Sequence, residues 1–201
     1  AAVPGKFPTL TEPDASYHGA VWTQAAPAAP FATRVLAQRL RDIGPTLSPY
    51  AAQLIGLGIE TLSLRVQRHS DNALAVAKFL STHECVDWVD YPLLEGNSRY
   101  ELAQKYLPNG ACGVISVGIK GGRDAACKFL DSLKLMNIVV HVADARSCVL
   151  HPASHTHRQL TDEQLVAAGV SADLVRMSIG IEDIEDIIED LEQAFNCVKE
   201  S

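Results

Sequence analysis

The spacing of apolar residues predicts that the first part of the chain is helical. Residues 1–26 are irregular, and two prolines then precede a helical pattern over residues 31–44. Gly44-Pro45 ends this pattern, as a C-terminal Gly followed by Pro should. A longer pattern over residues 48–83 predicts a second helical region, broken or bent near Gly56 and Gly58. Its buried face is expected to carry Val66, His69, Ala73, Val76, Ala77 and Leu80.

The pattern changes after residue 84, where short alternating runs are separated by short helical runs. We therefore expect an α+β layer, in which one sheet is covered by helices. The last helix has isoleucines on one face and acidic residues on the other, and Asp183 is placed to cap it. The predicted strands are 86–92, 113–120, 137–143, 147–152 and 174–180, and the predicted helices are 99–107, 123–134, 161–169 and 183–200.

Composition narrows the class of protein. The chain has 201 residues, and its 47% apolar and 20% charged content is typical of a globular domain. A net charge of -7 argues against a nucleic-acid partner, and no apolar run is long enough to cross a membrane. Five widely spaced cysteines without a C-x-x-C favour reduced thiols in a cytoplasmic protein. The chain starts without Met in a Pro- and Gly-rich loop, so we expect a fragment or processed piece.

Three histidines in HPASHTH, residues 151–157, raise the question of a metal site. A zinc site needs three or four convergent ligands, and an H-x-x-x-H pair is persuasive on a helix. Pro152 follows the first histidine and disfavours a helix there, and no cysteine or carboxylate pattern accompanies the run. The segment is therefore expected to be a loop whose histidines form hydrogen bonds, and no metal is expected.

Arg176 interrupts the apolar run LVRMSIG and is the strongest candidate for a binding residue. A guanidinium is costly to bury unless it meets an anion, and a carboxylate can accept two parallel hydrogen bonds from it. One interpretation is an internal salt bridge to Glu182 or Asp183. The other is that Arg176 holds a substrate carboxylate. The spacing alone leaves both open.

Several segments together resemble a single enzyme family along the whole chain. They are YHG at 17–19, RLRDIGPTLSP at 39–49, GIETLSLRVQRHSDNALAVAKFL at 58–80, WVDYPLL at 88–94 and the run over 151–195 that contains HPASHTH and LVRMSIGIED. They resemble the C-terminal half of the Cys/Met-metabolism family of pyridoxal-5'-phosphate (PLP) enzymes. Within that family the resemblance is greatest to the O-acetylhomoserine sulfhydrylases (homocysteine synthases).

This resemblance implies an α/β fold, namely the C-terminal part of a fold-type I (aminotransferase-like) PLP enzyme. Residues 1–45 would form the end of the large PLP-binding domain, and residues 46–84 a connecting helical segment. Residues 85–201 would form a small α+β domain with a mostly antiparallel sheet covered by helices. The missing N-terminal half would be a partner, and the active form would be a homo-oligomer, a tetramer of dimers.

The resemblance also implies an activity. The full-length protein would be a PLP-dependent transferase that makes homocysteine from O-acetylhomoserine and sulfide by γ-replacement, and this chain alone would be inactive. One alternative is a related γ-synthase or γ-lyase that uses another nucleophile. A second alternative, from a different class, is a non-catalytic carboxylate-binding or interaction module.

The expected site residues follow from the same resemblance. The Schiff-base lysine and the phosphate ligands would lie upstream, so no catalytic or cofactor-binding residue is expected in this chain. Arg176 matches the family's substrate-carboxylate arginine, and Thr156 belongs to the pocket-wall loop. His141 lies beside the carboxylate, at a position where relatives usually have Asn or Ser. Ala143 stands where they usually have Gly, so both departures bear on which amino-acid substrate is accepted.

Overall fold

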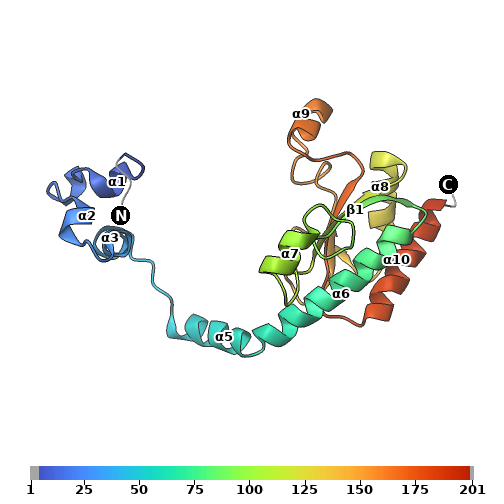
Figure 1. Ribbon diagram of the computed structural model, residues 1–201, viewed down its shortest axis with the longest axis horizontal. Coiled ribbons are helices and arrows are strands. Elements are labelled where there is room, and N and C mark those ends of the chain that lie inside the picture. Colours follow the sequence, from blue (N-terminus) through green and yellow to red (C-terminus); the bar gives the residue numbers. More distant parts are fainter. Residues whose placement is uncertain (1–4, 200–201) are drawn as a thin grey trace. The chain divides into compact units, whose positions relative to one another are not determined.

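The computed structural model describes residues 5–199 and is coloured along the sequence in Figure 1. The chain divides into two compact units, residues 1–58 and 59–201. The predicted division of the chain at residues 45 and 84 into parts of larger domains stays a prediction.

Short helices make up the first unit. They surround Trp22, which is 2% exposed and donates a hydrogen bond from its indole Nε1 to Asp14 Oδ2 at 3.0 Å. The helix predicted over residues 31–44 is present and ends at Gly44, whose φ of 72° is the left-handed conformation that Gly adopts most readily. The elements are α1 (Pro8–Thr11), η1 (Ala15–Tyr17), α2 (Trp22–Ala25), and the continuous run of α3 (Pro30–Arg34), η2 (Val35–Leu40) and α4 (Arg41–Ile43).

Two consecutive helices, α5 (Pro49–Glu60) and α6 (Leu62–Thr82), form the second helical region. The break lies at Thr61, close to the predicted glycines. The predicted buried face of α6 is present from His69 to Leu80, but Val66 is 48% exposed, so its assignment to the core is wrong. The reason is that α6 reaches the core of the second unit only from His69 onward.

A five-stranded sheet lies at the centre of the second unit, in the order β1-β2-β5-β4-β3. Every pairing is antiparallel except that of β3 with β4, so the expected mostly antiparallel sheet is confirmed. The strand predicted over residues 137–143 is shorter than expected, because only Asn137 and Ile138 pair with β4. The strands are β1 (Val86–Asp90), β2 (Val114–Ile119), β3 (Asn137–Ile138), β4 (Cys148–Leu150) and β5 (Leu174–Ser178).

Helices cover one face of this sheet. Figure 1 shows α6 and α10 (Ile184–Lys199) lying side by side, and α8 (Gly122–Ser132) packs against α10. Alternate strand residues face them, among them Val175 and Met177, which are fully buried in the main hydrophobic core. The two remaining helices, α7 (Tyr100–Tyr106) and α9 (Asp162–Ala167), lie in connections between strands.

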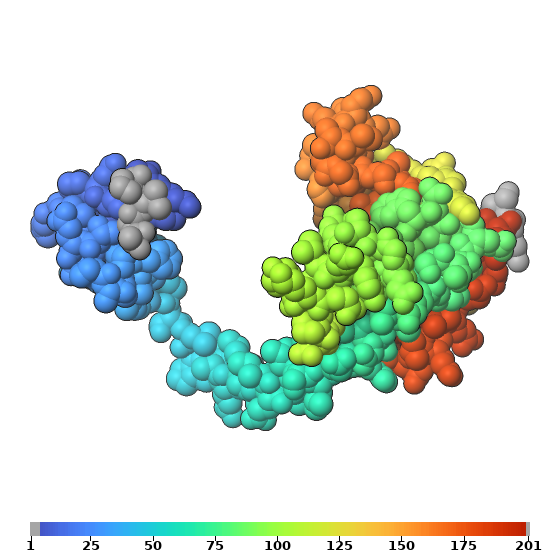
Figure 2. Space-filling view, in the orientation of Figure 1, coloured from blue at the N-terminus to red at the C-terminus, as the bar shows by residue number. Residues whose placement is uncertain are grey.

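A second, smaller cluster lies under the connection between β4 and β5. Ala153, Leu165 and Val170 form it, and Figure 2 shows the orange surface of this connection protruding from the rest of the unit.

The predicted cap of the last helix is present, since the Asp183 carboxylate accepts a hydrogen bond from Glu185 N at 2.9 Å. The predicted end of that helix at Glu200 lies outside the described residues.

Candidate functional site

Arg176 lies in the middle of the sheet. It is on β5, opposite Ser116 of β2 on one side and Leu150 of β4 on the other. Side chains alternate between the two faces of a strand, and its neighbours Val175 and Met177 point into the helix-covered core. Arg176 therefore belongs to the opposite face of the sheet.

A single hydrogen bond holds the guanidinium of Arg176. Its Nη2 donates to the carbonyl oxygen of Val140 at 3.0 Å, at the surface of the unit. Its Nε is buried and has no hydrogen-bond partner among the described residues. Within residues 5–199 the guanidinium forms no ion pair. Because Nε is covered, an anion would meet the two Nη groups.

The salt-bridge interpretation of Arg176 is therefore wrong for the structure described. Glu182 uses its carboxylate to accept hydrogen bonds from the backbone N–H and the hydroxyl of Ser147. Asp183 is occupied as a helix cap through Glu185 N. Both carboxylates thus have other partners, and the positive charge of Arg176 has no acidic partner among residues 5–199.

The carbonyl that holds Arg176 belongs to residues 139–146, which we call the 139–146 segment. It follows β3 and has no helix or strand of its own. Ala143 N donates to the hydroxyl of Ser178 at 3.0 Å, and Cys148 Sγ donates to His141 O at 3.2 Å. One backbone bond, from Val139 N to Val149 O at 3.1 Å, continues the pairing with β4. After Val139, bonds to side chains hold the segment along β4 and β5 in place of a strand ladder, which explains why the predicted strand ends early.

His141 directly follows Val140, whose carbonyl accepts the hydrogen bond from Arg176. His141 is therefore next to that contact. Its side chain is 60% exposed, and Nδ1 lies 3.6 Å from Asp144 Oδ2. The hydrogen bond from Arg146 N is the largest cause that lowers the pKa of the Asp144 carboxyl. His141 and Asp144 line a depression of about 240 Å³ beside β3. The structure thus places an ionisable pair next to the residue that orients the guanidinium.

The HPASHTH run forms a series of turns, as predicted for a loop. His151 is fully buried, and its Nε2 donates to Ala172 O at 2.8 Å, because a carbonyl can only accept. Nδ1 therefore accepts the hydroxyl hydrogen of Ser154 at 2.8 Å. His155 Nδ1 donates to His151 O at 3.1 Å. Two of the three histidines thus hold the turn together.

Thr156 lies on the same turn but is not joined to the other predicted residues. Its side chain is exposed, and Oγ1 shares a hydrogen bond of 2.9 Å with His157 Nδ1. Within the described part of the chain, no hydrogen bond joins Thr156 to Arg176 or His141. Its role at the substrate stays a prediction.

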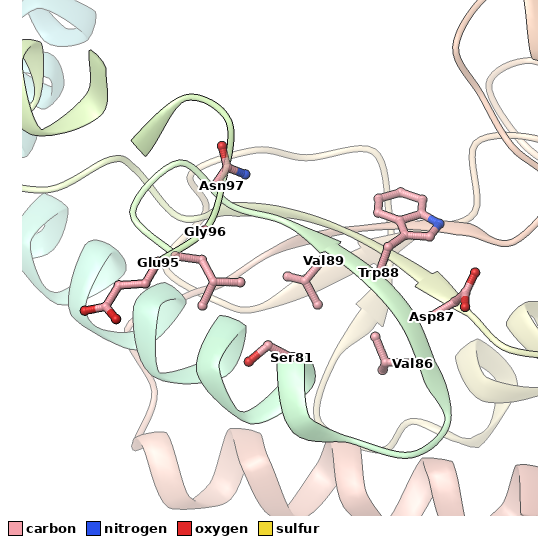
Figure 3. Close-up of a pocket in the computed structure, with 9 residues that line it drawn as sticks. Ser81, Val86, Asp87, Trp88, Val89, Glu95, Gly96 and Asn97 are labelled. Atoms are coloured by element: carbon pink, nitrogen blue, oxygen red, sulfur yellow. The ribbon is translucent and has the colours of Figure 1, made fainter. Parts of the chain in front are cut away.

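Another pocket lies at the outer edge of the sheet, along β1. It has a volume of about 310 Å³, and its lining includes none of the predicted site residues. Figure 3 shows Ser81, Val86 and Val89 on the α6 side of β1, whereas Trp88 lies on the other side. This pocket is separate from the surface that bears Arg176.

Residues 5–199 also bear on two other kinds of site, a metal centre and a membrane span. No group of three or more His, Cys, Asp or Glu side chains is arranged to hold a metal ion there. None of the helices described combines the length and apolar character needed to span a bilayer.

The sheet, its covering helices and the isolated arginine agree with one class of protein. Residues 17–196 match the model of the family described as Cys/Met metabolism PLP-dependent enzyme. The chain belongs to this family, and PLP is the family's cofactor.

The similar proteins within the family include homocysteine synthases and O-acetyl-L-homoserine sulfhydrylases. The chain is 46% identical over 189 residues to a homocysteine synthase of Schizosaccharomyces pombe, covering 94% of this chain and 44% of the relative. It is 45% identical over 203 residues to an O-acetyl-L-homoserine sulfhydrylase of Leptospira meyeri, covering 96% of this chain and 46% of the relative. The chain thus spans about half the length of the curated relatives that it matches.

A solved structure has the same fold. It is the crystal structure of a putative O-acetylhomoserine (thiol)-lyase from Campylobacter jejuni with N'-pyridoxyl-lysine-5'-monophosphate. The similarity has a TM-score of 0.84 at 38% identity and covers 94% of this chain and 45% of that one. The expected fold class, the α/β fold of the corresponding part of an aminotransferase-like PLP enzyme, is confirmed.

The residues described fit the substrate side of a PLP site. Arg176 presents a guanidinium whose charge has no acidic partner in residues 5–199, and its exposed Nη2 is oriented by the Val140 carbonyl. Such a group is suited to the carboxylate of an amino acid bound to the cofactor. The resemblance assigns the residues that hold PLP itself to the part of the protein upstream of this chain.

Proposed function

We propose that this chain is the substrate-clamping part of a PLP-dependent enzyme that makes homocysteine from O-acetylhomoserine and sulfide. The observation that carries the proposal is Arg176, which stands mid-sheet without an acidic partner in the described residues. The names of the similar proteins support the substrates, because they include a homocysteine synthase and an O-acetyl-L-homoserine sulfhydrylase.

When bound, PLP supplies an electron sink for the bonds at the amino acid's α-carbon. The residues of this chain orient the substrate. The two Nη groups of Arg176 donate two parallel, charge-assisted hydrogen bonds to the substrate carboxylate. The bond from Nη2 to Val140 O restricts rotation of the guanidinium, so that the carboxylate is held in one plane. This fixes the amino acid relative to the cofactor, which is a positioning contribution to the rate.

The same site is compatible with a γ-synthase or γ-lyase of this family, since any amino-acid substrate brings a carboxylate. The identity of the nucleophile depends on residues outside the Arg176 contact. His141 and Asp144 are the polar pair closest to that contact along the chain, and we propose that His141 influences which amino acid is accepted. The enzyme would work as a homo-oligomer in the cytoplasm, with the upstream half providing the cofactor site.

Arg176→Ala in the full-length enzyme tests the proposal. Loss of a charge-assisted contact to a carboxylate should weaken the grip on O-acetyl-L-homoserine by about 2–5 kcal/mol. We expect this loss in kcat/KM, while the absorbance of bound PLP stays unchanged, because Arg176 is not assigned to the cofactor. Steady-state kinetics and the visible spectrum provide the two measurements.

Arg123→Ala is the matched control. Arg123 is also in the second unit, but it forms a surface ion pair with Asp162, whose side chain is 80% exposed. Surface pairs contribute little, so this variant should keep wild-type kinetics. If Arg176→Ala has the same kinetics as Arg123→Ala, Arg176 does not hold the substrate and the proposal fails.

A further inference from the structure

The 139–146 segment is fastened to the turn that follows β5 by one carboxylate. Glu182 accepts the backbone N–H of Ser147 at one oxygen, and its other oxygen accepts the Ser147 hydroxyl at 3.0 Å. The same hydroxyl oxygen accepts Gly180 N–H at 2.8 Å. Ser147 is fully buried, so its N–H and hydroxyl have these groups as partners in place of water. We call Glu182, Ser147 and Gly180 the latch.

The latch is packed too closely for any side chain at Gly180. A Cβ there would lie 2.5 Å from Ala145 O and from Ser147 N, and closer still to the Glu182 carboxylate. Ile181 N also donates to Ala145 O at 2.9 Å. The C-terminal end of the segment and the turn after β5 therefore move as one piece.

Helix α6 anchors the other side of this turn. His69 Nδ1 donates to Ile179 O at 2.6 Å, and the Asn72 amide donates to Gly180 O at 3.1 Å and to Glu182 O at 2.9 Å. Both side chains are buried. Because α6 is packed into the main core, the backbone of Glu182 is a fixed base from which its carboxylate reaches Ser147.

The geometry points to Glu182 and Ser147 as positioning residues for the substrate carboxylate, an inference that rests on the proposed function. They act through the 139–146 segment. Beyond the single backbone bond from Val139 N to Val149 O, the segment has no strand ladder, and its Val140 carbonyl is the group that orients the Arg176 guanidinium. The latch fixes one end of the segment, and the bond from Ala143 N to Ser178 fixes its middle. Releasing the latch removes one of these anchors, which loosens the segment after Val140 and, with it, the carbonyl that sets the plane of the guanidinium.

The test uses the full-length holoenzyme with Glu182→Gln and Ser147→Ala. Glutamine has nearly the shape of glutamate, but its amide NH₂ cannot accept the second hydrogen bond from Ser147. Alanine removes the hydroxyl that bridges the two other members. Misplacing the guanidinium removes part of a charge-assisted contact with the substrate carboxylate, so we expect KM for O-acetyl-L-homoserine to rise at least about tenfold. The kcat and the content of bound PLP should stay near wild type.

A carboxamide analogue of the substrate provides the readout that separates positioning from general damage. It lacks the negative charge that Arg176 pairs with, so its inhibition constant should be the same in wild type and in both variants. Only ligands with a free carboxylate should bind more weakly. A variant whose structure is loosened in general would bind both kinds of ligand more weakly.

Asp190→Asn is the matched control. The Asp190 carboxylate is buried and accepts three backbone N–H groups, from Lys134, Leu135 and Met136, at 2.7 to 3.1 Å. Asp190 lies on α10 and holds the connection between α8 and β3, so like Glu182 it is a carboxylate that fixes a loop. It differs in that this loop is not the one that contacts Arg176. We expect this variant to unfold at a lower temperature and to keep the KM of the wild type.

The possible outcomes are distinct. If the Glu182 and Ser147 variants lose thermal stability as Asp190→Asn does but keep the wild-type KM, the latch is only structural and the inference is overturned. If Arg176→Ala raises KM while the latch variants do not, the inference alone fails. If Arg176→Ala itself leaves the kinetics unchanged, the proposed function is the part that fails.

Discussion

At the scale of single residues, His151 is the titratable side chain whose surroundings are most completely defined. It is fully buried, with Nε2 bonded to Ala172 O and Nδ1 bonded to Ser154 Oγ. Burial is the largest cause that lowers its pKa, because a charged imidazolium loses its hydration there. The neutral ring, with hydrogen on Nε2, is therefore part of the folded structure.

Acid should destabilise the chain through this residue. In the unfolded chain a histidine takes up a proton near about pH 6.5, whereas the folded chain resists protonation until a lower pH. Stability is therefore full above that pH and is lost as the pH falls toward the lowered folded pKa. We expect His151→Asn to reduce the slope of unfolding free energy against pH between 7 and 5, measured by urea titrations.

A control is needed because burial lowers the pKa of His83 too, which contributes a slope of the same sign. His151→Asn should thus reduce the slope without abolishing it. His141→Asn replaces a histidine that is 60% exposed and is the surface substitution for comparison. Equal slopes in all three proteins would contradict the assignment to His151.

The sequence could identify Arg176 but not the groups that act on it. An arginine in an apolar strand stands out, because its charge requires a partner. Val140 acts through its backbone carbonyl, which every residue possesses, so no sequence pattern marks it. Glu182 was recognised only as a possible partner of Arg176, since its real partner, Ser147, is 35 positions away.

At the scale of elements, α6 shows how far helical periodicity extends into the core. Val66 and Val76 belong to the same predicted apolar stripe, yet Val66 is 48% exposed and Val76 is fully buried. Burial of apolar surface stabilises the folded chain. Truncation of the two valines should therefore change the free energy of unfolding by different amounts.

We expect Val76→Ala to cost about 2 kcal/mol, from the lost methyl groups and the cavity that they leave. Val66→Ala should change the unfolding free energy of the 201-residue chain by less than about 0.5 kcal/mol. Chemical denaturation monitored by circular dichroism measures both. A similar cost at the two positions would mean that Val66 is covered in solution.

Most elements were predictable because each has its own local pattern. All five strands and the helices between them lie within or near the predicted ranges. The shortened β3 was not predictable, since NIVVHVA has strand composition throughout. His141 and Ala143 bond instead to side chains of β4 and β5, and such distant partners leave no trace in a local pattern.

At the scale of the whole molecule, α5 is a twelve-residue helix that the described residues leave uncovered. None of its residues is buried, although its only charged residue is Glu60. A helix that is apolar all round is normally enclosed by other elements. The relatives are about twice as long as this chain, so we propose that their additional part covers α5.

The 201-residue chain by itself should therefore self-associate through α5. Leu54, Ile55 and Leu57 are each more than half exposed, and large exposed apolar patches promote association. Replacing these three residues by Gln should shift the sedimentation profile toward monomer, while the thermal unfolding of the second unit stays unchanged, because its core lies elsewhere. In the full-length protein the same triple substitution should instead impair folding or assembly, because Gln would be buried there without partners. The comparison of the two proteins is decisive, because the triple substitution should improve the behaviour of the 201-residue chain and harm the full-length protein. A surface helix that nothing covers would tolerate Gln in both.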